Sequence, residues 1–299
     1  MKSQPSPAVG APGVLGAIGD LVEDVVVRLL EPVNTASDTR SQVTRRRGGS
    51  AANVVEAACR AGGTARFVGQ VGDDDLGRLL TDQLRQVGAE VEVRRGGRTG
   101  TIVVLVAHDG ERTMLTDRGA CADLDGADPR WLDGLHTLHV PYYSLVGEPL
   151  AGTTIDLVAE AHRRGIRVSV DVSSSAVLLA EGAVRALARI AALRPQVVLA
   201  NEDEAGVLGD GLRPHLLHGA MVVVKRGAGP ASLFTNDGAE HSVPAQRVEA
   251  VRDTTGAGDA FAAGLLLALA EGRTPVQAVQ HAHAVAADAV RRASNPAPR

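Results

Sequence analysis

Short apolar runs alternate with helical patterns along most of this 299-residue chain, and this alternation limits the folds that it can adopt. The apolar runs, rich in valine and leucine, lie at 14–18, 65–71, 137–140, 167–172, 197–200 and 221–225. Helical spacing of apolar residues is found between them, at 76–87, 155–164 and 183–193. Near-continuous apolar strands separated by helices indicate a parallel sheet covered on both faces. We therefore expect an α/β fold with a doubly wound, mostly parallel sheet.

Two segments, at about 25–45 and 91–117, depart from this alternation. In the second segment, the pattern predicts consecutive strands at Thr101–Ala107 and Thr113–Thr116, joined by an Asp109-Gly110 turn. The first segment is also extended and can add to this hairpin. We expect the two segments to form a small separate β-sheet that acts as a lid over a site.

Composition and charge bear on the class of protein. The chain is 44% hydrophobic and 22% charged, as is ordinary for a water-soluble protein, and its net charge of −4 offers no basic surface to nucleic acid. Residues 1–13 lack the basic and apolar regions of a signal peptide, and the longest apolar run, at 262–270, is too short to cross a bilayer. We expect a cytoplasmic protein that binds neither nucleic acid nor membrane, with one domain at 14–293 between a flexible tail at 1–13 and a frayed tail at 294–299.

A glycine-rich turn leads directly into an apolar helix in the stretch Asp253–Gly264. Gly256 and Gly258 lie just before a helical pattern that begins with Phe261. N–H groups at a helix N-terminus lack helical partners, and together with the helix dipole they form a site for an anion, most often a phosphate. The turn therefore predicts an anion site.

Asp259 lies beside this anion site, where a carboxylate would be unfavourable if binding were the only task. A carboxylate that accepts a proton from a hydroxyl, next to amides that stabilise charge on a transferring phosphoryl group, is what phosphoryl transfer to an alcohol requires. We therefore expect Asp259 to act as a general base. The alternative is that Asp259 only caps the helix, since carboxylates are favoured in a first helical turn.

A second glycine turn, Gly48–Asn53, opens another helical pattern. Such a turn can bring the backbone close to a ligand. Asn53 offers both a donor and an acceptor, as sugar hydroxyls require, and Asp24 can accept two hydroxyl hydrogens at once. The alternatives are that Ser50 is only a helix N-cap and that Asp24 is only a solvated turn residue.

Polar and glycine residues follow several of the expected strands. The positions at or just past strand ends are Asp24, Asn201, Glu204, Lys225 and Gly227. Because ligands of parallel α/β sheets bind beyond the carboxyl ends of the strands, we expect these residues to converge on one edge of the sheet. His281 and His283 lie within the last helical pattern instead, where an isolated histidine is more often packed than a ligand.

These turns resemble those of the ribokinase-like, PfkB-type carbohydrate kinase family. Two signatures carry the resemblance, in the family's order and spacing: Gly48–Asn53 followed by Gly69–Gly77, and Asp253–Gly264. The likeness extends to the order of elements from Val14 to Ala293, which is more specific than any single glycine motif.

The resemblance implies a ribokinase-like fold with a β lid, and an ATP-dependent kinase that transfers the γ-phosphoryl group to a hydroxymethyl group of a sugar or sugar-derived small molecule. It implies Asp259 as the base and the amides of Gly256, Ala257 and Gly258 as the anion hole. The family's other contacts match Asp24, Gly49 and Asn53 for the substrate; Asn201, Lys225, Gly227 and His283 for the nucleotide; Glu204 for Mg²⁺ through water; and Asp253 and Thr255 for a monovalent cation such as K⁺.

Departures from the family pattern bear on the substrate. Ser50 stands where ribokinases usually have lysine, and Val22 where they have asparagine. Pro141 lies near the position at which they present a carboxylate to the sugar. These differences argue against ribose itself.

Three other functions stay open at this point. A nucleoside kinase of the same family is disfavoured because aromatic residues are only 2% of the chain, so few rings are left to stack on a base. A non-catalytic sugar-binding regulator could use the same fold. A nucleotide-dependent oxidoreductase is suggested by Gly256-x-Gly258, although this motif comes late in the chain and lacks the third glycine of a dinucleotide fingerprint. The lid hairpin could also pair with a second subunit to form a homodimer.

Overall fold

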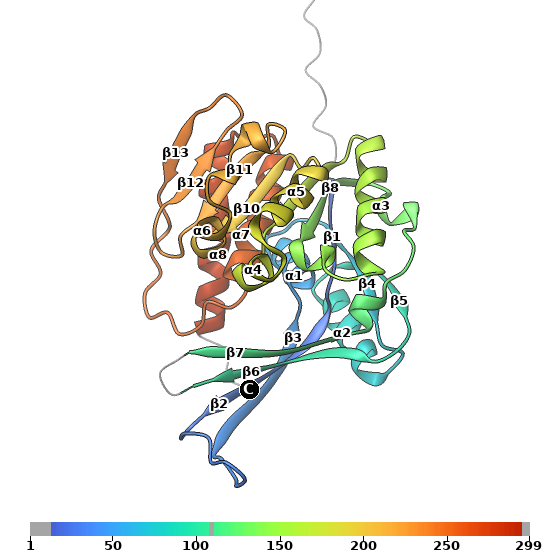
Figure 1. Ribbon diagram of the computed structural model, residues 1–299, viewed down its shortest axis with the longest axis vertical. Coiled ribbons are helices and arrows are strands. Elements are labelled where there is room, and N and C mark those ends of the chain that lie inside the picture. The colour runs from blue at the N-terminus through green and yellow to red at the C-terminus, as the bar shows by residue number, and fades with distance from the viewer. Residues whose placement is uncertain (1–12, 108–110, 295–299) are drawn as a thin grey trace, which may run out of the picture.

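The computed structural model describes residues 13–107 and 111–294, which form two β-sheets and a set of flanking helices (Figure 1). The expected N-terminal tail up to residue 12, the Asp109-Gly110 turn and residues 295–299 lie outside the described residues. No helix in the described part of the chain has the length and apolar character needed to span a membrane.

The larger sheet forms the body of the molecule. Its strands, within the described residues, are β1 (Val14–Ile18), β4 (Ala65–Val71), β5 (Glu90–Arg95), β8 (Leu135–Pro141), β9 (Arg167–Asp171), β10 (Val197–Asn201), β11 (Met221–Lys225), β12 (Ala231–Phe234) and β13 (Glu240–Val243). Their order across the sheet is β13-β12-β11-β10-β9-β8-β1-β4-β5. Every pair from β11 to β5 is parallel, and only β12 and β13 are antiparallel to their neighbours. The expected mostly parallel sheet is confirmed.

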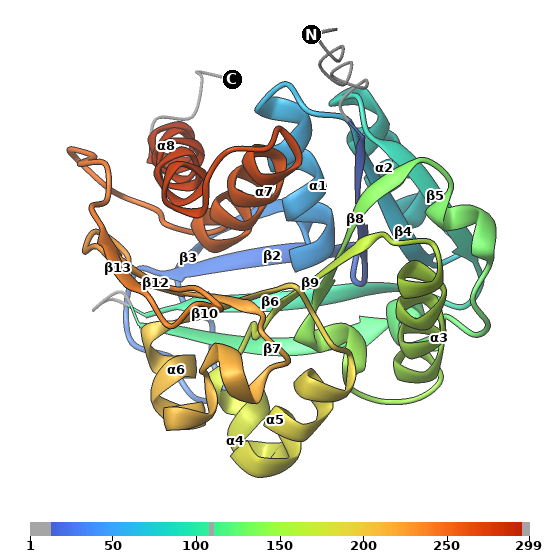
Figure 2. The ribbon, with the colours of Figure 1, turned by 90° about the horizontal axis from the view of Figure 1, so that it is seen from above.

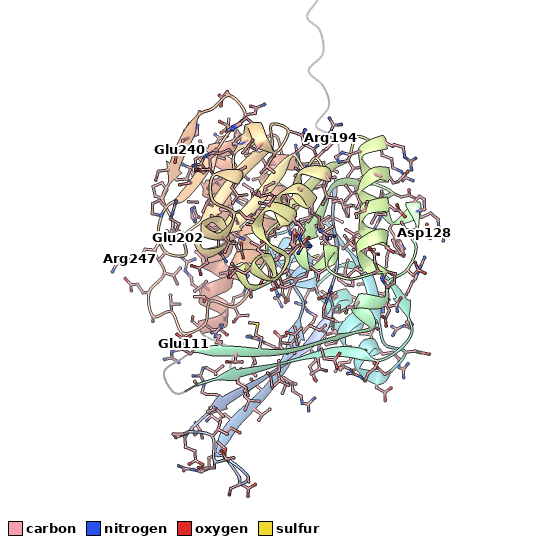
Figure 3. The ribbon with its side chains drawn as sticks, in the orientation of Figure 1. Glu111, Asp128, Arg194, Glu202, Glu240 and Arg247 are labelled. Carbon is pink, nitrogen blue, oxygen red and sulfur yellow. The ribbon has the colours of Figure 1, made fainter. Side chains whose placement is uncertain are left out.

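Helices cover both faces of this sheet (Figure 2). Their bounds are α1 (Ser50–Arg60), α2 (Asp75–Gln86), α3 (Leu150–Arg163), α4 (Ser175–Glu181), α5 (Ala183–Ala192), α6 (Glu202–Leu208), α7 (Ala257–Ala270) and α8 (Pro275–Ser294). The helices α1, α2, α7 and α8 pack into one buried apolar cluster, and α3 to α6 pack into another on the opposite face. Charged side chains such as Glu202, Glu240 and Arg247 project from the surface instead (Figure 3).

Helix α7 lies deepest in the first cluster. Its residues from Ala260 to Ala268 are all buried, which is the pattern of a helix that is apolar on every side. Gly264 allows α8 to approach closely, since a Cβ atom there would lie 2.9 Å from Cβ of Val285. This packing fixes the position of the glycine turn at the start of α7.

A smaller sheet crosses the end of the larger one (Figure 1). It contains β2 (Val22–Leu29), β3 (Ser41–Gly48), β6 (Thr99–Val106) and β7 (Arg112–Gly119), in the order β3-β2-β6-β7. The expected small sheet is therefore present. The segment 91–117 does not belong to it as a whole, however, because β5 pairs with β4 at the edge of the larger sheet. In β5, exposed residues alternate with half-buried valines, which is also the pattern of a half-exposed lid strand, so the sequence did not distinguish β5 from the strands that follow it.

The sequence pattern missed two short helices, α4 and α6, since seven residues are too few to show a helical period. One further local expectation was wrong. Ser294 is not part of a frayed tail: it is the last residue of α8, only 2% exposed, and its hydroxyl oxygen accepts hydrogen bonds from the backbone N–H groups of Arg252 and Asp253.

Candidate active site

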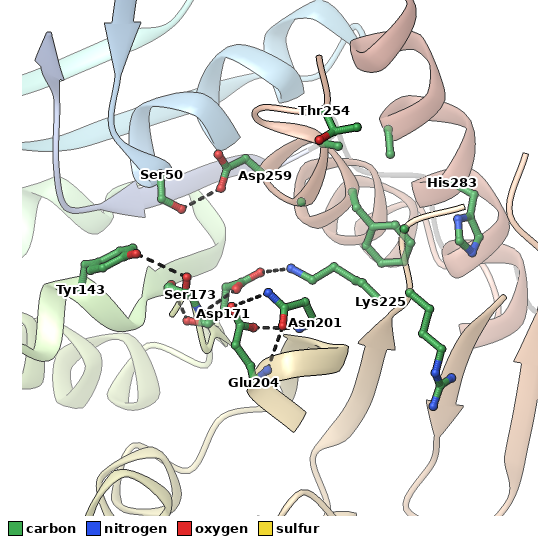
Figure 4. A pocket seen from close by; sticks show the side chains of 16 residues that line it. Ser50, Tyr143, Asp171, Ser173, Asn201, Glu204, Lys225, Thr254, Asp259 and His283 are labelled. Atoms are coloured by element: carbon green, nitrogen blue, oxygen red, sulfur yellow. Dashed lines mark hydrogen bonds and ion pairs between the residues drawn. The ribbon is translucent and has the colours of Figure 1, made fainter. Parts of the chain in front are cut away.

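The expected site residues gather at the carboxyl edge of the larger sheet, where they line two cavities, the first of which is shown in Figure 4. The first cavity, of about 430 Å³, is lined by the ends of β9, β10 and β11 and by the start of α7. The second, of about 610 Å³, is lined by β2, β3, α1 and the end of α8, so it lies partly under the small sheet. Parallel strands place their carboxyl ends together, which explains why residues far apart in sequence meet here.

Asp259 is held between the two glycine turns. Its Oδ1 accepts a hydrogen bond of 2.7 Å from the hydroxyl of Ser50, and its Oδ2 accepts one of 2.9 Å from Nδ2 of Asn53. The N-cap of α7 is Gly256, in the left-handed conformation, so Asp259 does not cap the helix. Burial raises the pKa of Asp259 to about 6, against the opposing effect of the hydrogen bonds from Ser50 and Asn53.

The amides at this helix start are only partly engaged. The N–H of Ala257 donates to the carbonyl oxygen of Thr254 at 3.1 Å. Within the described residues, the N–H groups of Gly256, Gly258 and Asp259 have no hydrogen-bond partner. Free amides at a helix N-terminus attract anions, so this end of α7 is suited to a phosphate.

Lys225 supplies a positive charge under the same amides. It ends β11, and its Nζ donates a 2.6 Å hydrogen bond to Oδ2 of Asp171, which ends β9 (Figure 4). A Cβ atom built on Gly258 would lie 3.5 Å from this Nζ, so the ammonium group reaches the anion site. Burial acts to lower the pKa of Lys225, but the charge and hydrogen bond of Asp171 outweigh it and raise that pKa.

Asn201 and Glu204 form the cap of α6. The side chain of Asn201 accepts from the N–H of Glu204 at 2.8 Å, and the Glu204 carboxylate accepts from the N–H of Asn201 at 2.7 Å, which is a capping box. Glu204 is 2% exposed, and burial followed by the charge of Asp171 raises its pKa to about 7. Both residues line the first cavity.

Gly227 and His283 also line the first cavity. Gly227 has a φ of 55°, in the left-handed region that favours glycine. His283 is 7% exposed, packs edge-on against Phe261 and approaches the carbonyl oxygen of Val243 at 3.2 Å through Nε2. It is therefore a packed helical histidine whose surface also lines the cavity.

Asp24 and Asn53 line the second cavity. Asp24 is not a solvated turn residue, because it lies within β2, and burial raises its pKa despite the nearby charges of Arg46 and Arg47. Gly49, rather than Ser50, is the N-cap of α1. A Cβ atom on Gly49 would lie 2.1 Å from the carbonyl oxygen of Asp20, so only glycine fits this turn.

Asp253 and Thr255 lie where the small sheet touches the body. Oδ1 of Asp253 accepts from Thr255 and from Arg112 of β7, and Oδ2 accepts from Arg46 of β3 at 3.1 Å. Arg112 also donates to Oγ1 of Thr255 at 2.8 Å. Burial acts to raise the pKa of Asp253, but the Thr255 hydrogen bonds and Arg46 lower it to about 2.

Several residues of the site were not expected from the sequence. Asp171 follows the strand-end pattern and could have been found by it, since it is the last residue of β9. Ser173, with a φ of 69°, and Tyr143 also line the first cavity, but nothing in the local sequence marks them. The arginines of the second cavity were seen only as a short basic run at 45–47.

Comparison with known proteins agrees with this architecture. The family model described as pfkB family carbohydrate kinase matches residues 15–297. A fructokinase of Klebsiella pneumoniae is 32% identical over 279 residues, which are 88% of this chain and 86% of that protein. Among solved structures, the fold is similar to that of an adenosine kinase from Sinorhizobium meliloti, with 24% identity and a TM-score of 0.80 over 95% of this chain and 100% of that one. It is equally similar to a fructokinase from Xylella fastidiosa with bound ATP, with 24% identity and a TM-score of 0.80 over 94% of this chain and 93% of that one.

Proposed function

Because the chain belongs to the pfkB family of carbohydrate kinases, we propose that it transfers the γ-phosphoryl group of ATP to a hydroxymethyl group of a sugar or sugar-derived small molecule, with Asp259 as the general base. Membership of the family shows a carbohydrate kinase, which is a phosphotransferase with an alcohol acceptor. The acceptor group and the role of Asp259 are inferred from the position of Asp259, between a cavity with free helix amides and a second cavity lined by polar side chains.

Asp259 takes the proton of the acceptor hydroxyl. With a pKa of about 6, its carboxylate is mostly ionised at neutral pH and is more basic than an ordinary aspartate. The hydrogen bonds from Ser50 and Asn53 orient the two carboxylate oxygens. Asp24, Gly49 and Asn53 form the substrate side of the site in this proposal.

The start of α7 holds the phosphoryl group. The free amides of Gly256 and Gly258 and the ammonium group of Lys225 stabilise the negative charge on its oxygens, and the amide of Ala257 joins them when it releases the carbonyl of Thr254. Asn201 contacts the phosphates. Gly227 and His283 line the nucleoside end of the same cavity.

In this proposal Glu204 of the first cavity holds a magnesium ion through water, which its carboxylate can do while it keeps its hydrogen bonds from Asn201. Mg²⁺ keeps most of its waters and binds through one or two carboxylates together with substrate phosphates. The Glu204 carboxylate, with its pKa raised by burial and by Asp171, would be stabilised by a divalent cation and would hold it through water. When bound, the ion would neutralise charge on the nucleotide phosphates.

The residues at Asp253 and Thr255 do not fit a monovalent cation. Both carboxylate oxygens of Asp253 accept hydrogen bonds from arginine side chains of the small sheet, and Thr255 accepts one as well. The guanidinium groups of Arg46 and Arg112 therefore already supply positive charge at this loop. No part of the mechanism depends on K⁺.

The small sheet acts as the lid in this proposal. Arg46 and Arg112 come from its two outer strands, and both contact Asp253 in the body of the molecule. Closure of the sheet over the second cavity would exclude water during transfer.

Two other functions are less well supported. A nucleoside acceptor would need rings to stack on, whereas the residues that line the second cavity include arginines and no aromatic side chain within the described residues. A non-catalytic regulator would not need Asp259 to be oriented by two donors beside free helix amides.

Two further expectations remain proposals. The exposed side chains of Val43 and Leu115 on the small sheet support a homodimer through the lid, which light scattering can test. A cytoplasmic location can be tested by cell fractionation.

The decisive test is a coupled assay of ATP consumption over a panel of sugars, sugar acids and nucleosides. Wild-type protein should turn over with at least one acceptor, and the product should carry phosphate on a primary hydroxyl. The Asp259→Asn variant should bind ATP but turn over slowly. Full turnover by that variant would contradict the role of Asp259.

A further inference from the structure

The second cavity has an excess of positive charge. Four arginines line it, Arg46, Arg47, Arg60 and Arg292, against the carboxylates of Asp24 and Glu56. The first cavity has the opposite character, because Asp171, Glu204 and Asp259 line it together with only Lys225 and Arg226. The excess of positive charge is therefore confined to the second cavity.

The carboxylates around the second cavity are shared between several arginines. Glu56 forms ion pairs with both Arg47 and Arg60. Asp253 is likewise shared by Arg46 and Arg112, and Asp24 lies 3.6 Å from Arg46. Arg112 and Asp253 do not line this cavity, so its lining has four guanidinium groups and two carboxylates, an excess of positive charge.

Arg292 is the group with no counter-charge. It is exposed near the C-terminal end of α8 and lines the cavity, and its side chain has no hydrogen bond or ion pair within the described residues. Its neighbour Arg291 differs, because it is paired with Asp288 on the outer side of the same helix and does not line the cavity.

Arg47 brings positive charge close to the reacting groups. Its Nη1 donates to Oδ1 of Asn53 at 3.3 Å, and the same Asn53 donates to Asp259. The Arg47 side chain is 8% exposed, and burial lowers its pKa to about 10. Its ion-pair partner Glu56 is shared with Arg60, so an additional anion beside Arg47 would be stabilised.

We propose that the second cavity binds an anionic group of the acceptor, a carboxylate or a phosphate ester, so that the substrate is an acidic sugar derivative rather than a neutral sugar. Arginine recognises both groups through paired N–H donors. The carboxylates of Asp24 and Glu56 do not balance the four arginines that line the cavity. The inference rests on the proposed function, because it assigns this cavity to the acceptor of the same reaction.

The first arm of the test compares acceptors that differ only in the anionic group. Gluconate is compared with glucitol, and fructose 6-phosphate with fructose, in the coupled assay. The anionic member of at least one pair should have the higher kcat/KM, and the pair in which this occurs distinguishes carboxylate from phosphate recognition. A higher kcat/KM for the neutral member of both pairs would overturn the inference and leave the proposed kinase function standing.

The second arm uses variants of the unpaired arginine. Arg292→Gln should lower kcat/KM for the anionic acceptor by about ten-fold, as expected for loss of one charge-assisted hydrogen bond, and should leave the neutral acceptor unchanged. Arg291→Gln is the matched control and should change neither. Equal losses on both acceptors, or no loss with Arg292→Gln, would contradict the assignment.

A binding measurement keeps the inference testable if no acceptor turns over. Inorganic phosphate should raise the melting temperature of the wild-type protein and of Arg291→Gln more than that of Arg292→Gln. Where turnover is seen, phosphate should compete with the acceptor. Equal stabilisation of all three proteins, or inhibition at saturating ATP that the acceptor does not relieve, would overturn the inference; saturating ATP keeps phosphate out of the anion site at the start of α7. Absence of turnover on every alcohol would instead count against the proposed function.

Discussion

Nδ2 of Asn53 donates a 2.9 Å hydrogen bond to Oδ2 of Asp259, across 206 positions of sequence. This contact joins the glycine turn at Gly48–Asn53 to the glycine turn before α7. It places the expected substrate side of the site directly against the expected base.

Asp259→Asn should lower kcat by roughly 10²–10⁴-fold, because the variant cannot take the hydroxyl proton. ATP binding, measured by calorimetry, should change little, since the helix amides and Lys225 remain. Asp288→Asn, on the exposed side of α8, is the control and should keep full activity.

The rate should rise with pH through about 6, because Asp259 must be ionised to accept a proton and burial raises its pKa to about that value. The measurement is kcat/KM between pH 5 and pH 8 at constant ionic strength. A profile that is flat over this range, with chemistry shown to be rate-limiting, would contradict the assignment of Asp259 as base.

Asp259→Asn should be more stable than wild type at pH 8 and should lose this advantage by pH 4. The folded-state pKa of Asp259 is raised from 3.8 to about 6, so its favourable contribution is present at low pH and is lost as the pH rises through about 6. The difference in unfolding free energy should be at most about 3 kcal/mol, and smaller where water enters the cavity. Denaturant titrations of both proteins isolate this effect from that of the buried histidines. A difference that grows toward low pH would have the wrong sign.

Lys225→Met should lower kcat by roughly 10²-fold, as for loss of one preorganised donor to the transferring group, and should leave KM for the acceptor unchanged. Lys225→Arg keeps the charge next to Asp171 and should recover part of the loss. A purely structural role for Lys225 would lower the melting temperature of Lys225→Met without a selective effect on kcat. Thermal unfolding and steady-state kinetics on the same samples separate the two cases.

Activity should not depend on K⁺. Replacing K⁺ by tetramethylammonium at constant ionic strength should leave kcat/KM unchanged, because Arg46 and Arg112 already contact Asp253. Arg112→Gln should weaken this arrangement and make the rate sensitive to K⁺. Arg98→Gln, which removes an exposed ion pair with Asp117 elsewhere on the lid, is the control. Strong activation of the wild type by K⁺ would show that a cation enters the loop despite the arginines.

Much of the fold could be predicted because its signals are local. The buried strands β1, β4 and β11 have the bounds that their apolar runs predict, since such runs end where the chain leaves the core. Edge and lid strands are half-exposed and lack a continuous apolar run, so the pattern does not mark their bounds or their sheet. The pattern of β5 is that of a lid strand, and only its pairing with β4 assigns it to the larger sheet.

The sequence alone determined the α/β alternation, the two glycine turns and the candidate acid at the start of α7, because each depends on residues within a few positions of one another. Only the tertiary structure decided which charges meet. Lys225 pairs with Asp171 at a separation of 54 positions, and Arg46 with Asp253 at 207. No local pattern records such pairings, since they depend on which strand ends lie side by side and on where the small sheet rests. The charge of each half of the site follows from that arrangement.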